Sequence, residues 1–399
     1  MANQPTGRIK VLHVITRFIL GGAQENTLLT VFGLKDSPRY EPLLATGPAE
    51  GPEGSLLERA RSSGITPIIV PELVREISPF ADYAAYRVLR RLIREIKPVI
   101  VHTHSSKAGI LGREAAWRER VPIIVHTIHG PPFHAREKFW KNALYTWLER
   151  REAKRSSALI SVADAMTRQY LDRHIGRPEQ YVTIRSGMEV EPFLKSYDKA
   201  QVRKRLSVPP NAFVIAKIAR LAPLKGHEDL LKAVSQVRRV HPDVHLLFIG
   251  DGELRPQITA LASTLGLSDS LTLTGLVPPT EIPELLSGAD CLVHASYREG
   301  LPRAVVQAML AGLPVVAYAL DGTPEVVDDG KTGFLIPAGD ISGLSAAIDK
   351  VFSNPAASSA MGAAGRSRVS GEFSWRAMVQ SIEALYDRLL NQCPSLCHT

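Results

Sequence analysis

Two positively charged side chains follow one short apolar segment in the second half of the 399-residue chain. Arg220 and Lys225 come soon after Phe213–Ile218, and Gly226 opens the next expected helix. An arginine fork and a lysine ammonium both bind phosphate oxygens. Together they could stabilise the negative charge that grows on a diphosphate when a bond to it breaks. A solvated basic loop is the alternative that this segment alone leaves open.

A second group combines an acid, a glycine and a helix start. It runs from Glu299 through Gly300 and Leu301 into a helix that carries Gln307. Glycine lets backbone approach a ligand closely, and the free amides of a helix start favour phosphate. Glu299 and Gln307 can lie at most about 12 Å apart along a helix, roughly the reach from a sugar hydroxyl to a ribose across a diphosphate. An ordinary helix cap is the alternative.

Histidines are the candidate functional residues of the first half. His129 ends an apolar segment beside a glycine, which predicts a role at a ligand. His104 and Lys107 are candidates for contacting an acceptor or, alternatively, for capping the helix that follows. His102 and His104 alternate without an interleaved cysteine or acid, so we predict no metal site. His126 is expected to be a hydrogen-bonded residue within a strand.

Short segments rich in Val and Ile alternate with helical patterns along the whole chain. Strands are predicted over residues 9–15, 42–46, 66–70, 99–102, 123–127, 158–162, 182–184, 213–218, 244–249, 271–273, 291–294, 315–317 and 333–336. The clearest helix has Ser78 as a capping residue, Pro79 in its first turn and apolar residues at helical spacing over 81–96. Apolar strands between helices predict parallel sheets that are covered on both faces.

The pattern restarts after a linker rich in Pro, Ser and charge, which indicates an α/β protein with two Rossmann-like domains facing across a cleft. We expect domains over residues 1–185 and 186–372. Residues 373–399 are expected to form a helix that packs back toward the N-terminal domain and then a frayed tail. Ligands of open parallel sheets bind beyond the carboxyl ends of the strands, where both charged groups lie.

Composition limits the cellular setting. Hydrophobic residues make up 45% and charged residues 22% of the chain, as in soluble globular proteins. No apolar run is long enough to span a membrane, no signal peptide is recognisable, and three cysteines are too few for a disulfide framework, so a cytoplasmic protein is expected.

Residues 1–185 hold 28 Lys and Arg against 18 Asp and Glu. This net charge of +10 suggests an anionic partner or, alternatively, serves solubility alone. Nucleic-acid motifs are absent.

Taken together, these motifs resemble glycosyltransferase family 4, within the GT-B fold. Further matches occur in the same order and at the same strand ends: Gly21-Gly22-Ala23-Gln24-Glu25, His102-Thr103-His104-Ser105-Ser106-Lys107-Ala108-Gly109, Ile128-His129-Gly130 with Phe133 and His134, and Gly250-Asp251-Gly252-Glu253. The segment from His102 to Arg113 is most similar to members that build exopolysaccharide or lipid-linked glycans.

The resemblance implies roles for individual residues of the second half. Arg220 and Lys225 would hold the donor diphosphate and stabilise it as the leaving group. Glu299 would orient the donor sugar, next to Gly300 and Leu301. Position 307 would hold the ribose, and the usual acid there is glutamine in this chain, which predicts weaker or altered nucleotide binding.

Other positions complete the implied donor site. Gly21 and Gly22 would form the loop at which acceptor and diphosphate approach. His129 would lie against the donor sugar. Gly250 and Gly252 would line the base together with Val277.

The resemblance implies a retaining hexosyltransferase that moves a sugar from a nucleoside diphosphate, UDP-linked, to a saccharide or isoprenoid-linked acceptor. No cofactor is expected, and since no Asp-x-Asp occurs we expect no metal requirement, so a chelator should leave the rate unchanged. A basic helix with Arg87, Arg90, Arg91 and Arg94 suggests peripheral contact with anionic membrane at its inner face. The alternatives are a non-catalytic sugar-nucleotide-binding protein and a sugar-nucleotide epimerase. A nicotinamide oxidoreductase is disfavoured because neither half has Gly-x-Gly-x-x-Gly after its first strand.

Overall fold

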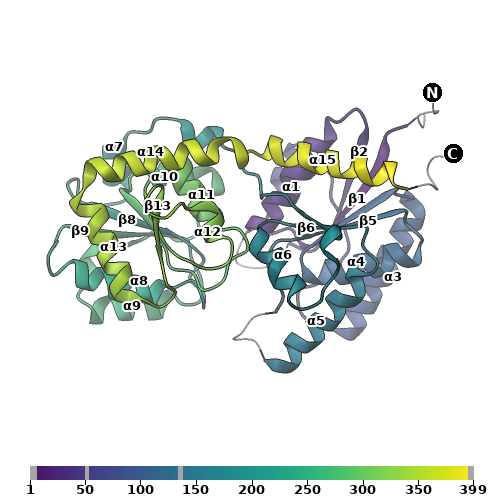
Figure 1. Cartoon of the computed structure of the whole chain (residues 1–399), viewed down its shortest axis with the longest axis horizontal. Helices are drawn as coiled ribbons and strands as arrows, with labels where there is room; N and C mark the ends of the chain where they lie inside the picture. Colours follow the sequence, from purple (N-terminus) through teal and green to yellow (C-terminus); the bar gives the residue numbers. More distant parts are fainter. Residues whose placement is uncertain (1–6, 50–53, 134–137, 394–399) are drawn as a thin grey trace. The chain divides into compact units, whose positions relative to one another are not determined.

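The computed structural model describes residues 7–49, 54–133 and 138–393 of the chain (Figure 1). The chain divides into two compact units, of which the first comprises Met1–Met188 with Ser374–Thr399 and the second Glu189–Phe373. His134 and the expected tail after Cys393 lie outside the described residues. Among the helices of the described residues, none combines the length and the apolar character that a membrane span requires.

The first unit is built on a parallel sheet of seven strands in the order β3-β2-β1-β4-β5-β6-β7. Its strands are β1 (Ile9–Arg17), β2 (Tyr40–Gly47), β3 (Ile68–Ile69), β4 (Ile100–His104), β5 (Ile123–Ile128), β6 (Ala158–Ser161) and β7 (Tyr181–Thr183). Its helices are α1 (Gly22–Lys35), α2 (Leu57–Ser62), α3 (Pro79–Ile96), α4 (Ser106–Arg118), α5 (Phe139–Ala153), α6 (Asp164–Leu171) and α15 (Trp375–Asn391). Helix α15 packs against α1 and inserts Tyr386 into the core of this unit.

The second unit has a parallel sheet of six strands in the order β10-β9-β8-β11-β12-β13. Its strands are β8 (Phe213–Ile218), β9 (Val244–Ile249), β10 (Leu271–Leu273), β11 (Cys291–His294), β12 (Val315–Tyr318) and β13 (Gly333–Ile336). Its helices are α7 (Lys199–Arg205), α8 (His227–Val237), α9 (Arg255–Thr264), α10 (Ile282–Ser287), α11 (Arg303–Leu310), α12 (Thr323–Val326), α13 (Ile341–Ser353) and α14 (Pro355–Glu372).

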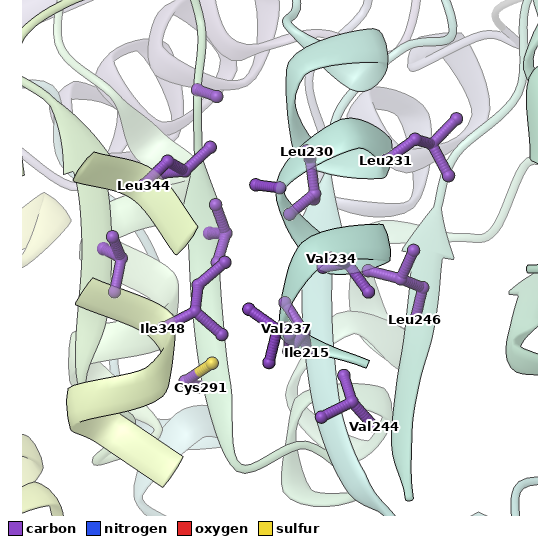
Figure 2. Packing of buried hydrophobic residues seen from close by; sticks show 14 of the residues in the cluster. Ile215, Leu230, Leu231, Val234, Val237, Val244, Leu246, Cys291, Leu344 and Ile348 are labelled. Carbon is purple, nitrogen blue, oxygen red and sulfur yellow. The ribbon is translucent and has the colours of Figure 1, made fainter. Parts of the chain in front are cut away.

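A continuous apolar core joins the second sheet to its helices. Figure 2 shows Val237 of α8 beside Ile215 of β8, within the same cluster as Val234 of α8 and Ile348 of α13. Helices α8 and α13 pack against each other over this face of the sheet. Burial of these side chains, at about 1.5–3 kcal/mol for each, fixes the sheet whose strand ends carry the candidate site.

All the strands predicted from the sequence are present, and both sheets are parallel as expected. The largest difference at a site is in β4, which continues beyond its predicted end to His104. Here polar side chains continue a strand that composition alone would have ended. Ring nitrogens of His102 and His104 are hydrogen-bonded inside the unit, which offsets the cost of burying these side chains.

The expected capping role of Ser78 is wrong. Ser78 occupies the position before α3 but its side chain makes no capping hydrogen bond. Instead its backbone N–H donates to Asp82 Oδ2 at 3.3 Å, so the helix start is closed by the acid in its first turn. The end of α3 agrees with the sequence, since Lys97 adopts a left-handed conformation with φ of 53°.

Candidate active site

The loop after β8 is bound to the loop after β11. Tyr297 donates its backbone N–H to the Leu224 carbonyl at 2.8 Å. Gly226 has φ of 64°, and a Cβ atom there would lie 1.8 Å from the Ala295 carbonyl oxygen. Only glycine fits this combination of left-handed backbone and close approach. The contact therefore brings Lys225 next to the residues that follow β11.

Lys225 and Glu299 form an ion pair at this point, the carboxyl edge of the sheet. The distance from Lys225 Nζ to Glu299 Oε1 is 2.7 Å. His294, the last residue of β11, places Nε2 3.3 Å from the same oxygen. Asp321, from the loop after β12, accepts the Glu299 backbone N–H at 2.8 Å and so fixes the backbone of the acid.

Electrostatics keep the Glu299 carboxyl ionised. Its burial alone would raise the pKa, but the Lys225 ammonium and His294 outweigh this effect and hold the pKa of Glu299 well below its ordinary value. The side chain is still 18% exposed. Glu299 is thus a permanent hydrogen-bond acceptor that a hydroxyl-bearing ligand can reach.

Lys217 is a charged residue of this region that sequence reasoning missed. It lies in β8, its side chain is buried, and its Nζ has no hydrogen-bond partner among the described residues. Burial first, and the Lys225 charge next, lower the pKa of Lys217 to about 7. Nearby, Asp229 Oδ2 accepts hydrogen bonds from the hydroxyls of Tyr297 and Tyr318 at 2.6 and 2.7 Å. A lysine inside an apolar strand was the signal that could have identified it.

The glycines of the 250–254 loop allow that loop to lie on the segment after β8. A Cβ atom at Gly250 would lie 2.3 Å from the Ala219 carbonyl oxygen, and one at Gly252 would lie 2.5 Å from that of Leu221. Leu221 in turn donates its N–H to the Asp251 carbonyl at 3.0 Å. The two loops form one backbone layer at the carboxyl edge.

The remaining predicted residues of the second unit take different positions. Arg220 is exposed just beyond β8, and its carbonyl accepts a hydrogen bond from His227 Nε2 at 3.0 Å. Gly300 and Leu301 are buried before α11, and Gln307 is half-buried within that helix. Val277 is half-buried after β10. The structure thus joins Lys225 to Glu299 directly, and it places Arg220, Gly300, Leu301 and Val277 on loops that follow strands and Gln307 within α11.

In the first unit, imidazole rings follow the carboxyl ends of the central strands. His129 comes directly after β5, and its Nε2 lies 3.2 Å from His104 Nδ1. His104 Nε2 lies 3.1 Å from Nδ1 of His13, a residue of β1 that sequence reasoning did not single out. Gly21 precedes α1 with an extended φ of 174°, and Gly22 is the first residue of that helix.

The acceptor contact predicted for His104 is not supported by its position. His104 is fully buried beneath His129, so it offers no surface to a ligand. Lys107 forms an ion pair of 2.5 Å with Asp82 of α3 and a hydrogen bond to the Glu76 carbonyl. His126 is a hydrogen-bonded strand residue, as expected, with Nδ1 2.9 Å from Thr103 Oγ1.

Three imidazoles of this unit come close enough to be considered as metal ligands. One ring nitrogen from each of His13, His102 and His104 lies within 4.8 Å of the others. The group contains no carboxylate or thiolate. His102 already uses both nitrogens, with Nδ1 2.6 Å from Tyr386 Oη and Nε2 2.7 Å from Thr127 Oγ1. A metal ion could bind His102 only if one of these two hydrogen bonds were broken.

Comparison with known proteins identifies the chain. Residues 198–368 match the family described as Glycosyl transferases group 1, and residues 22–187 match the Glycosyl transferase 4-like domain. A protein of Escherichia coli named UDP-Gal:alpha-D-GlcNAc-diphosphoundecaprenol alpha-1,3-galactosyltransferase is 31% identical over 86% of this chain and 88% of its own length. The chain belongs to glycosyltransferase family 4.

A second relative and two solved structures are also similar to this glycosyltransferase. The protein named putative glycosyltransferase EpsD, from Bacillus subtilis, is 28% identical over 79% of this chain and 83% of its own length. A crystal structure of the Anabaena protein HepE in complex with UDP-glucose aligns with a TM-score of 0.81 at 22% identity, covering 96% of this chain and all of that one. Sucrose-phosphate synthase from Thermosynechococcus elongatus aligns with a TM-score of 0.82 at 20% identity, over 96% of this chain and 100% of its own. The predicted GT-B fold is confirmed.

Proposed function

We propose that this glycosyltransferase moves a hexose from a UDP-linked donor to a hydroxyl of a saccharide or isoprenoid-linked acceptor, with retention of anomeric configuration and without a metal. The Lys225–Glu299 ion pair at the carboxyl edge of the second sheet carries the proposal. An ammonium and an ionised carboxylate side by side can bind the diphosphate and the sugar of a nucleotide sugar, respectively. The cation binds the diphosphate, and the carboxylate accepts hydrogen bonds from the sugar hydroxyls.

Lys225 and Arg220 act on the leaving group in this proposal. The charge on the diphosphate grows as the glycosidic bond breaks, so a cation that is already in position stabilises the transition state more than the ground state. The backbone amides at the start of α11 add donors on the same edge, next to Gly300. The proton of the attacking hydroxyl passes to an oxygen of the departing phosphate, which requires no base from the protein.

The donor and acceptor classes are proposed from what related proteins are named for. The Escherichia coli relative is named for UDP-galactose and a diphosphoundecaprenol-linked GlcNAc acceptor, and the HepE structure contains UDP-glucose. A lipid-linked acceptor would be presented at a membrane, so a membrane-facing surface on the first unit would support this proposal.

The basic stripe predicted on α3 is a weaker membrane surface than the sequence suggested. Arg90 lies 2.5 Å from Glu119 and Arg91 lies 3.5 Å from Glu95, so part of the positive charge is compensated. Surface ion pairs of this kind contribute little to stability, but they reduce the net attraction to anionic lipid.

Exposed aromatic side chains on α3 and α5 favour a different membrane contact. Phe80 and Phe139 are 91% and 88% exposed, and Tyr83, Trp140 and Trp147 are also exposed. Helix α4 packs against both α3 and α5, and each of the three helices begins at the carboxyl edge of the sheet (Figure 1). Aromatic rings prefer the membrane interface. We infer that this aromatic surface, comprising these five residues, rests on the membrane that holds the acceptor.

A ligand panel followed by a turnover assay tests the proposal. UDP-glucose, UDP-galactose, UDP-GlcNAc and GDP-mannose are compared for thermal stabilisation, because a bound donor raises the melting temperature by mass action. The stabilising donor is then incubated with and without a polyprenyl-diphosphate-linked GlcNAc. Acceptor-dependent release of UDP and an α-linked product by NMR are expected, with the same rate in EDTA.

The outcomes of this assay separate the alternatives. Stabilisation without turnover, even with the lipid-linked and free saccharide acceptors, would favour a binding protein. Conversion of the donor to another sugar nucleotide without an acceptor would favour an epimerase. A β-linked product or abolition of the rate by EDTA would contradict retention or metal independence, respectively.

A further inference from the structure

A row of three imidazole rings leads from the carboxyl end of β5 into the core of the first unit. His129 Nε2 lies 3.2 Å from His104 Nδ1, and His104 Nε2 lies 3.1 Å from His13 Nδ1. The ring centroid of His104 lies 5.5 Å from that of His129 and 5.4 Å from that of His13. The ring planes are nearly parallel in both pairs. Each ring thus meets the next through one nitrogen, and His104 uses both of its nitrogens.

Strand register explains why the rings meet. His13 of β1 pairs with His102 of β4 in the sheet, and His104 lies two residues farther along the same strand. Residues two apart in a strand point to the same face, so the three side chains share the face that α15 covers with Tyr386. His129 follows the neighbouring strand β5 and continues the row at its carboxyl end.

The two buried rings of the row are neutral. Burial lowers the pKa of His13 to about 3, and burial together with the neighbouring imidazoles holds the pKa of His104 well below its ordinary value. A neutral imidazole carries one N–H and one bare nitrogen. Since every link of the row needs one donor and one acceptor, the tautomer of one ring determines that of the next.

The inner end of the row selects between the two arrangements. His13 Nε2 is buried and has no hydrogen-bond partner among the described residues. If that nitrogen carried the proton, an N–H would be buried without an acceptor, which folded proteins rarely tolerate. The proton therefore lies on His13 Nδ1, which donates to His104 Nε2. His104 in turn carries its proton on Nδ1 and donates to His129 Nε2.

We propose that His13 and His104 are positioning residues that hold His129 in the Nδ1–H tautomer, with Nε2 occupied as an acceptor. His129 then carries its proton on Nδ1 and accepts through Nε2, so it keeps no bare ring nitrogen that could act as a base. This assignment deepens the proposed function, on which it rests, because an imidazole without a bare nitrogen cannot take the acceptor's proton, which is left to the departing phosphate.

Tautomers are read directly by long-range ¹H–¹⁵N NMR of the ¹⁵N-histidine-labelled protein, assigned with His129→Asn and His104→Asn variants. We expect the Nδ1–H form for both His104 and His129. His13→Phe removes the donor at the end of the row, whereas His13→Asn retains an amide N–H near the position of Nδ1. His13→Phe should give a mixture of tautomers at His129, and His13→Asn should restore the single form.

Kinetics provide the second readout. His13→Phe should lower kcat by about tenfold or more with little change in the donor KM, as loss of groups that hold a functional imidazole does elsewhere, and His13→Asn should recover most of it. His126→Asn is the matched control, because His126 is equally buried but lies on the opposite face of the sheet, bonded to Thr103. It should change neither the His129 tautomer nor kcat.

Three results would overturn the inference. The first is an Nε2–H tautomer at His129 in the unaltered protein. The second is an unchanged tautomer and kcat in His13→Phe. The third is a stoichiometric metal ion in the purified protein, bound at His13, His102 and His104. Because the NMR experiment requires no turnover, a failure of the proposed transfer reaction remains distinguishable from a failure of the imidazole row.

Discussion

Lys225 and Glu299 are 74 positions apart in sequence, yet their charged groups lie 2.7 Å apart. Two parallel strands that are neighbours in the sheet, β8 and β11, bring them together at their carboxyl ends. The two side chains are 27% and 18% exposed, so a ligand can reach both charged groups without separating the strands that hold them. Such preorganisation means that no reorientation of the two groups needs to accompany the reaction.

Replacing Lys225 or Arg220 by alanine should each lower kcat by about 10²–10³, because each removes a cation from the growing charge on the leaving group. Steady-state assays with the donor identified by the panel measure the effect. Lys232→Ala is the control, since Lys232 pairs with Glu228 on the exposed surface of α8. Near-normal turnover in both site variants would remove these roles from Arg220 and Lys225.

Gly226→Ala should destabilise the second unit and reduce donor binding. A left-handed conformation at a non-glycine residue costs roughly 1–2 kcal/mol. The added Cβ would also lie 1.8 Å from the Ala295 carbonyl, so the loop that carries Lys225 must move. Chemical denaturation gives the loss of stability, and calorimetry gives the loss of donor affinity.

Gly371→Ala is the matched control for that substitution. Gly371 lies in α14 of the same unit, and a Cβ atom there would meet nothing within 4 Å. Alanine is the better helix former, so this variant should be as stable as the parent or more stable, by up to about 1 kcal/mol. Equal losses in the two variants would show that the close approach at Ala295 is unimportant.

The sequence was sufficient for the strands and for the ends at which charged residues gather. Apolar runs bounded by Gly, Pro or Ser are local signals, and parallel sheets collect their carboxyl ends on one edge. The link between His13 and His104 could not be predicted in this way, because it depends on the register between β1 and β4. Register is a property of paired strands and of the side chains packed between them, and one strand alone does not contain it.

Lys217 could be recognised in the sequence, but its burial could not be predicted from the sequence. Its charge was visible within an apolar strand, but an isolated charged residue in a strand can lie at a surface as easily as in a core. The structure shows that Lys217 is buried and lies near enough to Lys225 for that charge to lower its pKa further, and both facts depend on tertiary packing. Likewise, the positive charge of Arg90 on α3 is compensated by Glu119, which lies just after α4. A helical wheel of α3 does not show this ion pair.

Gln307→Glu should strengthen donor binding. The family's usual acid at this position accepts a hydrogen bond through a charged oxygen, which is about 1 kcal/mol better than an amide oxygen, or about fivefold in affinity. Calorimetry with the donor measures the change. Gln236→Glu on the exposed face of α8 adds the same charge away from the site. An unchanged or weaker affinity for Gln307→Glu would contradict a ribose contact.

Stability of the first unit should fall on acidification below pH 6.5. His13, His102, His104 and His126 are all buried, and burial holds their pKa values below the ordinary 6.5. Between 6.5 and the folded-state pKa the unfolded chain binds a proton that the folded chain does not. Each histidine therefore removes about 1.4 kcal/mol of unfolding free energy for each pH unit lost in this range.

Urea denaturation at pH 7, 6 and 5.5 tests this slope above the range in which carboxylates titrate. His126→Asn should reduce the slope by one proton, whatever its effect on stability at pH 7. His174→Asn is the control, because His174 is exposed and its backbone φ of 53° is one that asparagine adopts readily. A slope of zero in the parent protein would mean that the buried histidines bind protons equally in both states.

The aromatic surface should attach the protein to lipid vesicles, and Phe139→Glu with Trp140→Glu should weaken this attachment by at least tenfold. Each ring loses contact with the membrane interface, worth about 1.5–3 kcal/mol when buried, and the new carboxylates repel anionic headgroups. Sedimentation with phosphatidylglycerol and phosphatidylcholine vesicles at low salt measures the partition. Val240→Glu is the control, since Val240 is an exposed apolar residue of the other unit. Turnover of a short water-soluble acceptor should be unchanged in the double variant, because only access to membrane-held substrate is lost. Equal sedimentation of the double variant and the parent would place the membrane contact elsewhere.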